Sequence, residues 1–138
     1  MNTTAVSVKK IVKQFSLVFC ISIVPAHGLV AQTKLAQCIS MASQMNSQLP
    51  MQIDSFTKLE ATSCIEDRGQ IFFQYVHIIS SSSKLPKDVE KSAKLSAKNQ
   101  YCTNKEFRNA LSIFNFDFYY LDTRKNPLYS FTLTKNDC

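Results

Sequence analysis

The sequence predicts an α+β fold in which helices pack on one face of an antiparallel sheet of about four strands, arranged as two hairpins. Three observations support this prediction. Apolar residues recur at helical spacing over 33–49, aromatic and β-branched residues fill 70–79, and polar and apolar residues alternate over 114–120 and again over 128–134. The expected order is helix, strand, strand, helix, helix, strand, strand.

The first helix is expected over 33–49, where Pro50 ends it. Its apolar residues fall three or four apart and so define one face: Leu35, Cys38, Ile39, Ala42, Met45 and Leu49. A half-buried strand is predicted over 51–65, with one parity apolar: Ile53, Leu59, Ala61 and Ile65. A turn at Gly69 leads into 70–79, which is apolar on both parities and is expected to be a central strand.

The second half begins with a lysine-rich helix predicted over 85–100, whose inner face carries Val89, Ala93 and Ala97. Thr103 and Glu106 have the spacing of a capping box, so a second short helix is expected from about Asn104. It would bury Phe107, Ala110 and Leu111. The alternating runs 114–120 and 128–134 flank a turn and predict the closing hairpin.

The start of the chain is typical of a signal peptide. Lys9, Lys10 and Lys13 precede the apolar run 15–24, which is shorter than the roughly 20 residues needed to span a bilayer. Pro25 and small residues follow, so we expect cleavage after Gly28 or Ala31. The predicted organisation is therefore a signal peptide, 1–31, and a single exported domain, 32–138, located in the periplasm or outside the cell.

Cys20 has an alternative interpretation as the lipidated cysteine of a lipoprotein, because Leu17-Val18-Phe19-Cys20 resembles a lipobox. The residue before such a cysteine should be small, and Phe19 is bulky. We therefore interpret Cys20 as part of the apolar run, where cysteine is ordinary.

Charge argues against nucleic acid as a partner. Removing 1–31 takes away three of the 16 basic residues and none of the 10 acidic ones, which leaves a net charge of about +3. A charge this small, spread over a domain, is not the footprint of a nucleic-acid-binding protein.

Four cysteines remain after cleavage, and an even number in a small exported domain indicates two disulfides. They are Cys38, Cys64, Cys102 and Cys138. Three pairings are open, and we favour 38–64, which ties the first helix to the first strand, with 102–138, which ties the helical segment to the last strand. Zinc is the competing interpretation, but no C-x-x-C spacing occurs, so neither a metal nor another cofactor is expected.

His77 is the one histidine outside the predicted signal peptide, and no acid or nucleophile is placed beside it by the sequence. We interpret it as a structural strand residue and predict a protein that is not an enzyme. A small secreted hydrolase using His77 is the alternative. A catalytic carboxylate pair is an alternative interpretation of the acids, which we expect to be solvated surface instead: Glu66, Asp67, Asp117, Asp122 and Asp137.

Two features suggest an interaction surface. Lysines at spacings of three or four define one face of the central helix: Lys84, Lys87, Lys91, Lys94 and Lys98. This face could contact an acidic partner or an anionic membrane, or could simply be solvated. Five tyrosines fall on or near the strands, and any on an uncovered sheet face, such as Tyr119, would offer binding area rather than core packing.

The second half resembles a known family. Its lysine-rich helix, Tyr101-Cys102, the segments 107–111 and 118–122, and the closing 131–138 are similar to the α+β pilotins of type II secretion and to small exported proteins of Gram-negative bacteria. Pilotins are lipoproteins that bind the tail of a secretin. The resemblance implies an exported bacterial binding protein. Export, small size, the expected disulfides and the absence of a catalytic constellation lead us to expect a protein partner, with three candidate roles: a secretion-system accessory, an immunity-type inhibitor, or a secreted type II substrate or virulence-associated factor.

Overall fold

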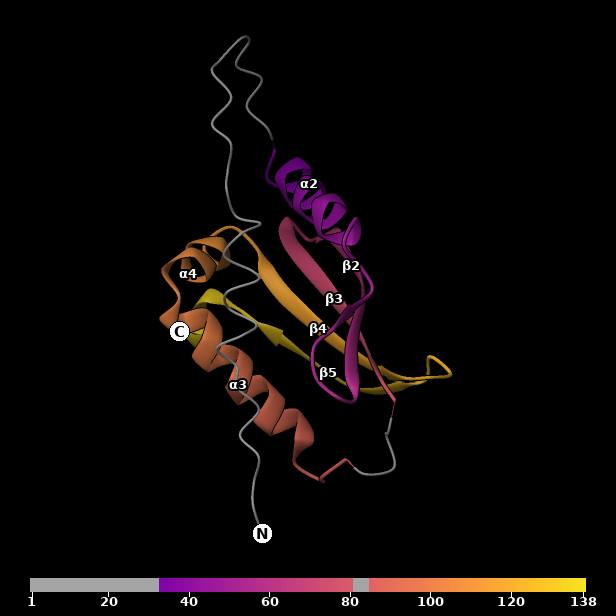
Figure 1. Cartoon of the computed structure of the whole chain (residues 1–138). Helices are drawn as coiled ribbons and strands as arrows, with labels where there is room; N and C mark the ends of the chain where they lie inside the picture. The colour runs from indigo at the N-terminus through magenta and orange to yellow at the C-terminus, as the bar shows by residue number, and fades with distance from the viewer. Residues whose placement is uncertain (1–32, 81–84) are drawn as a thin grey trace. The chain divides into compact units, whose positions relative to one another are not determined.

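A computed structural model of the chain describes residues 33–80 and 85–138 (Figure 1). The predicted signal peptide with its cleavage sites, Cys20 and Lys84 lie outside these residues. The helices are α2 (Lys34–Asn46), α3 (Val89–Thr103), α4 (Lys105–Leu111) and the 3₁₀-helix η2 (Lys135–Asp137). The strands are β1 (Met51–Gln52), β2 (Thr57–Asp67), β3 (Gln70–Ile79), β4 (Asn115–Asp122) and β5 (Pro127–Leu133). None of the helices in this part of the chain is both long and apolar enough to cross a membrane.

The strands form one sheet in the order β1-β2-β3-β4-β5, with three α-helices beside it, so the predicted α+β class is confirmed. Both predicted hairpins are present, since β2 pairs antiparallel with β3 and β4 with β5. The prediction that the sheet is wholly antiparallel was wrong, because β3 and β4 are parallel. The chain between them passes through α3 and α4, and such a crossover returns it in the same direction. The sheet is therefore mixed.

A bulge in β2 changes which side chains face the helices. Leu59 is opposite His77 and Ala61 is opposite Val76, so Glu60 is the extra residue. Beyond it the parity reverses: Thr62 is buried, whereas Ile65 is 42% exposed. The prediction that Leu59, Ala61 and Ile65 share one face was therefore wrong, because the bulge places Ala61 and Ile65 on the face opposite to Leu59.

The start of α4 also differs from the prediction. Asn104 is the N-cap, and its side chain accepts hydrogen bonds from the amides of Glu106 and Phe107 at 2.8 and 3.3 Å. Thr103 ends α3 instead, where its hydroxyl donates to the Asn99 carbonyl at 2.6 Å. The capping box predicted at Thr103 was wrong by one residue, because the Asn104 side chain already satisfies the free amides at the start of α4.

The core lies between the sheet and the three helices, which cover the same face (Figure 1). Phe73 and Phe116 are almost fully buried, and their rings lie 5.9 Å apart. Tyr101 of α3 reaches across them to donate a hydrogen bond to the Tyr75 hydroxyl at 3.0 Å. This bond satisfies a buried polar pair, while burial raises the pKa of Tyr75 to about 12.

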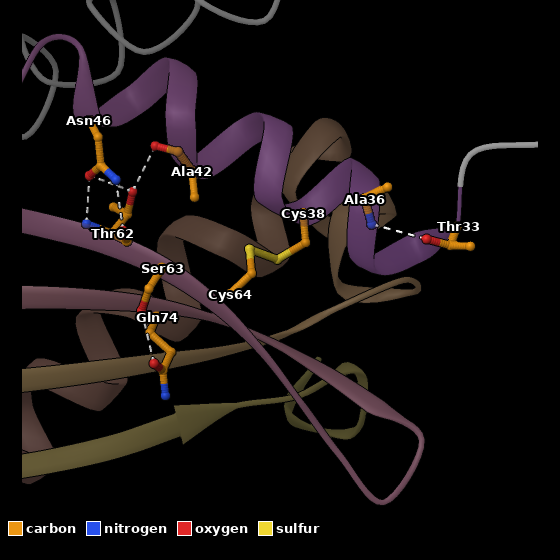
Figure 2. Close-up of a disulfide and its surroundings, with 9 residues drawn as sticks. All are labelled: Thr33, Ala36, Cys38, Ala42, Asn46, Thr62, Ser63, Cys64 and Gln74. Carbon is orange, nitrogen blue, oxygen red and sulfur yellow. Dashed lines mark hydrogen bonds between the residues drawn. A yellow bond between two sulfur atoms is a disulfide. The ribbon is translucent and has the colours of Figure 1, made fainter.

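Both predicted disulfides are present. Cys38 of α2 is bonded to Cys64 of β2, with 5.9 Å between their Cα atoms (Figure 2). Cys102 near the end of α3 is bonded to the terminal Cys138, with a Cα separation of 5.2 Å. The favoured pairing is thereby confirmed. The first bond joins α2 to β2, whereas the second joins the end of α3 to the residue after η2 and not, as had been predicted, to the last strand.

Candidate functional site

Three of the five lysines predicted to form one face of the central helix lie on α3: Lys91, Lys94 and Lys98. Lys94 is 3.5 Å from an Asp137 carboxylate oxygen, which connects this side of α3 to the segment after β5. Lys91 and Lys98 lie about one turn to either side and are exposed, as is Lys87 just before the helix. None of these three forms an ion pair with another described residue. Their ammonium groups are therefore available to an acidic surface.

Tyr119 lies on the other side of the sheet from α3. Its neighbours Phe118 and Tyr120 stack on the helix-covered face, so strand alternation directs Tyr119 to the face that no described helix covers. Its hydroxyl donates to Asp117 at 3.3 Å and accepts from Gln74 at 3.4 Å. The lysines and Tyr119 therefore belong to two separate surfaces.

A row of polar side chains crosses four strands on this uncovered face. Register places Ser63, Gln74, Asp117 and Thr132 side by side. Ser63 donates to Gln74 at 2.9 Å and Thr132 donates to Asp117 at 2.6 Å. Asp117 is only 8% exposed, so the prediction that it is solvated was wrong. A carboxylate this buried needs hydrogen-bond donors, and the two hydroxyls of Thr132 and Tyr119 supply them.

The remaining tyrosines are largely part of the core. Tyr75 and Tyr101 are buried, and Tyr120 stacks on Tyr129 with ring centroids 4.4 Å apart. Of the other predicted acids, Glu66 and Asp67 end β2, Asp122 ends β4, and Asp137 ends η2. Only Tyr119 among the five projects onto the uncovered face.

His77 lies in an aromatic row on the helix-covered face. It is 7% exposed and stacks on Tyr120 with 4.5 Å between ring centroids. Burial lowers its pKa to about 4, which outweighs a hydrogen bond with the Tyr119 backbone and the charge of Asp54. Its Nδ1 atom has no hydrogen-bond partner among the described residues. Asp54 is close enough to influence this pKa, but neither it nor a nucleophile is hydrogen-bonded to Nδ1 among the described residues. A neutral imidazole without such a bond is not arranged for proton transfer.

The described residues, 33–80 and 85–138, contain no group of side chains arranged as a metal site. No group of three or more histidine, cysteine, aspartate or glutamate side chains there is placed to hold an ion. The four cysteines are consumed by the disulfides.

The two edges of the sheet differ in whether their outward backbone groups have hydrogen-bond partners. At the β2 edge, the Asn46 side chain donates to the Thr62 carbonyl and accepts from the Thr62 amide, both at 2.8 Å (Figure 2). The short β1 pairs with β2 at Leu59 and Lys58. The β5 edge has no such partner among the described residues. Periodicity alone did not reveal this asymmetry, because Asn46 is distant from β2 in sequence.

No protein-family model matches the chain, and no curated protein matches it. Among solved structures, the fold is similar to the type 2 secretion system pilotin EpsS of Vibrio vulnificus, at 14% identity and a TM-score of 0.62, over 76% of this chain and 91% of that one. It is also similar to the type II secretion pilotin AspS of Vibrio cholerae, at 16% identity and a TM-score of 0.57, over 76% and 92%.

A third similar structure is that of a protein of Pseudomonas aeruginosa whose description reads "putative secreted protein". The two chains are 11% identical, the TM-score is 0.59, and the likeness covers 82% of this chain and 99% of the other. These similarities confirm the resemblance in fold that the sequence predicted.

Proposed function

We propose that this protein is an exported accessory of bacterial type II secretion that acts by binding another protein. The observation that supports the proposal is the shared fold, which extends over nine-tenths of each Vibrio pilotin. The disulfides agree with export, because such bonds persist in oxidising compartments.

The partner proposed from the pilotin resemblance is a segment of the secretin, the outer-membrane channel of the system. Exposed Lys87, Lys91 and Lys98 would add attraction for acidic residues on it. Because Cys20 is a poor lipidation site, the protein would act without a lipid anchor. The periplasm is the compartment in which it would meet the secretin.

A second candidate is a factor that leaves the cell and acts outside it. The observation that favours this function is the similarity in fold to the Pseudomonas aeruginosa protein with the description "putative secreted protein". Fractionation separates the two candidates, since an accessory stays in the envelope and a secreted factor accumulates in the medium. The hydrolase alternative is not favoured, because His77 is buried without a catalytic partner.

The test uses a deletion strain of the host bacterium. Loss of the protein should reduce the heat-resistant secretin multimers in the outer membrane and leave normally secreted enzymes in the periplasm. Tagged protein expressed from a plasmid should restore both and should co-purify with the secretin. Normal multimers and normal secretion in the deletion strain would contradict the proposal.

A charge-reversal variant tests the lysine face. Lys91→Glu combined with Lys98→Glu should lower the yield of co-purified secretin and make the remainder sensitive to salt. Lys105→Glu together with Arg108→Glu is the matched control, because both residues are exposed and lie on α4 instead of α3. Equal losses in the two variants would assign the effect to net charge rather than to this face.

A further inference from the structure

Strand β5 ends the sheet and presents a free backbone edge. It follows β4 in the strand order, and no other described strand lies beyond it. A strand in this position exposes amide and carbonyl groups that can pair with another chain.

The contacts of Thr134 identify the groups that point outward. Its amide donates to the Asp137 carboxylate at 2.8 Å and does not pair with β4. Backbone groups alternate in direction along a strand, so the amides and carbonyls of Thr132 and Ser130 also point away from β4. No hydrogen bond between described residues reaches them.

At the β2 edge, by contrast, the outward backbone groups are covered. There Asn46 occupies both outward groups of Thr62, and β1 covers the residues before them. At β5, Pro127 limits one end because it lacks an amide hydrogen, and Asp137 limits the other. Between these limits the edge stays open over 128–132.

The charges around β5 indicate what fits this edge. The strand carries no charged residue, whereas Arg124 and Lys125 precede it and Lys135 follows it. The acids nearby already have partners: the Asp122 carboxylate accepts hydrogen bonds from amides of the β4–β5 turn, Asp137 lies 3.5 Å from Lys94, and Glu60 lies 3.9 Å from Lys125. A second copy pairing antiparallel about Ser130 would place Lys135 opposite Lys125 of the other copy. Like charges facing each other across strands are destabilising, which disfavours self-association.

We propose that the β5 edge is a docking site for an extended segment of a partner protein, with an uncharged centre and acidic residues at its ends. The segment adds a sixth strand, in which its backbone pairs with Ser130 and Thr132 and its acids lie near the basic residues at either end of β5. This proposal rests on the proposed function only in taking the partner to be a protein.

A purely protective role is the competing explanation. Basic residues and proline at a strand edge also discourage aggregation. Protection requires only positive charge, whereas docking requires that acidic ends be preferred over basic ones. A peptide series can therefore distinguish the two.

The experiment measures amide exchange by NMR on the ¹⁵N-labelled exported protein. The probes are the peptide Glu-Thr-Val-Thr-Val-Thr-Glu, the same peptide with lysine ends, and an acidic-ended peptide with a central proline. At saturation, the first peptide should slow exchange at Ser130 and Thr132 at least about tenfold, because paired amides exchange only when the bound strand opens. The other two should have little effect.

Two variants supply the controls. Ser130→Pro removes an outward amide without removing a bond to β4, so it should abolish peptide binding while the protein stays folded. Ser130→Ala keeps that amide and should bind as wild type. The exchange rates of wild type remain decisive even if Ser130→Pro fails to fold.

Protection of other amides, or equal protection by acidic and basic peptides, would overturn the proposal. So would equal binding to Ser130→Pro. Absence of secretin from the co-purification, with edge binding intact, would remove the secretion role and leave the docking site. Secretin binding without protection at Ser130 and Thr132 would remove the docking site and leave the secretion role.

Discussion

Asn46 and Thr62 are joined by reciprocal hydrogen bonds, although they are 16 residues apart in sequence. Asn46 is the last residue of α2, and its side-chain amide pairs with the Thr62 backbone as a neighbouring strand would. The Thr62 hydroxyl adds a bond to the Ala42 carbonyl at 3.2 Å. The end of α2 is therefore fixed to the sheet by the same groups that close the β2 edge.

Replacing Asn46 with alanine should destabilise the domain by about 1–3 kcal/mol, because the partly buried Thr62 amide and carbonyl lose their partners. Urea unfolding measures the change. Gln44→Ala is the matched control, since that side chain is exposed and bonds only within α2, and it should be nearly neutral. A loss no larger than that of the control would show that water replaces Asn46 freely.

Each disulfide should contribute strongly to the free energy of unfolding. They close loops of 26 and 36 residues, for which chain entropy predicts about 3–4 kcal/mol each. Replacing both cysteines of one pair by alanine and measuring urea unfolding tests this value. Non-reducing peptide mapping checks the pairing itself, and a peptide linking Cys38 to Cys102 or to Cys138 would contradict it.

Stability should depend on the protonation of His77. Its pKa is about 4 in the folded protein and 6.5 as a free side chain, so the unfolded state binds the proton first as the pH falls. Stability is therefore lost from about pH 6.5 down to 4. Between pH 7 and 5 the loss should be about 2 kcal/mol.

His77→Phe isolates this contribution, because it keeps the stacking on Tyr120 and removes the titrating group. Its urea midpoint should change much less than that of wild type between pH 7 and 5. Secretion by the variant should stay within a few-fold of wild type. A loss of several hundred-fold with an intact fold would favour the hydrolase alternative.

The exported protein should have the mass of a chain cleaved after Gly28 or Ala31, with both disulfides formed and no lipid attached. Intact-mass spectrometry of periplasmic material measures this directly. A mass that begins at Cys20 and includes a diacyl group would contradict the prediction and would indicate a lipid-anchored pilotin.

The sequence predicted elements whose pattern is local. The alternation around Phe116 and Phe118 located β4, and Cys38 on an apolar helix face pointed to the bond with Cys64. The bulge at Glu60 was missed because a single extra residue reverses the apolar parity without leaving a compositional signal. The two-residue β1 was missed because it is too short for any periodicity.

Features that depend on distant contacts were not predictable. The parallel pairing of β3 with β4 is decided by the path of the crossover and not by either strand's own pattern. Asp117 has the parity of a solvated residue, yet Thr132 and Tyr119 enclose it. The surfaces were predicted residue by residue, but their separation onto two sides of the sheet required the topology.

The parallel pairing of β3 with β4 also divides the molecule. One disulfide lies wholly before this junction and the other wholly after it, so neither disulfide of the described residues spans it. Each half has its own antiparallel hairpin and at least one helix. A chain cut between β3 and α3 would thus yield two internally cross-linked pieces, joined by the β3–β4 pairing, by the contact of Phe73 with Phe116 and by the hydrogen bond from Tyr101 to Tyr75. The two halves could therefore be produced as separate chains and fused to two other proteins. Their reassembly would then report whether those two proteins bind each other in the bacterial envelope.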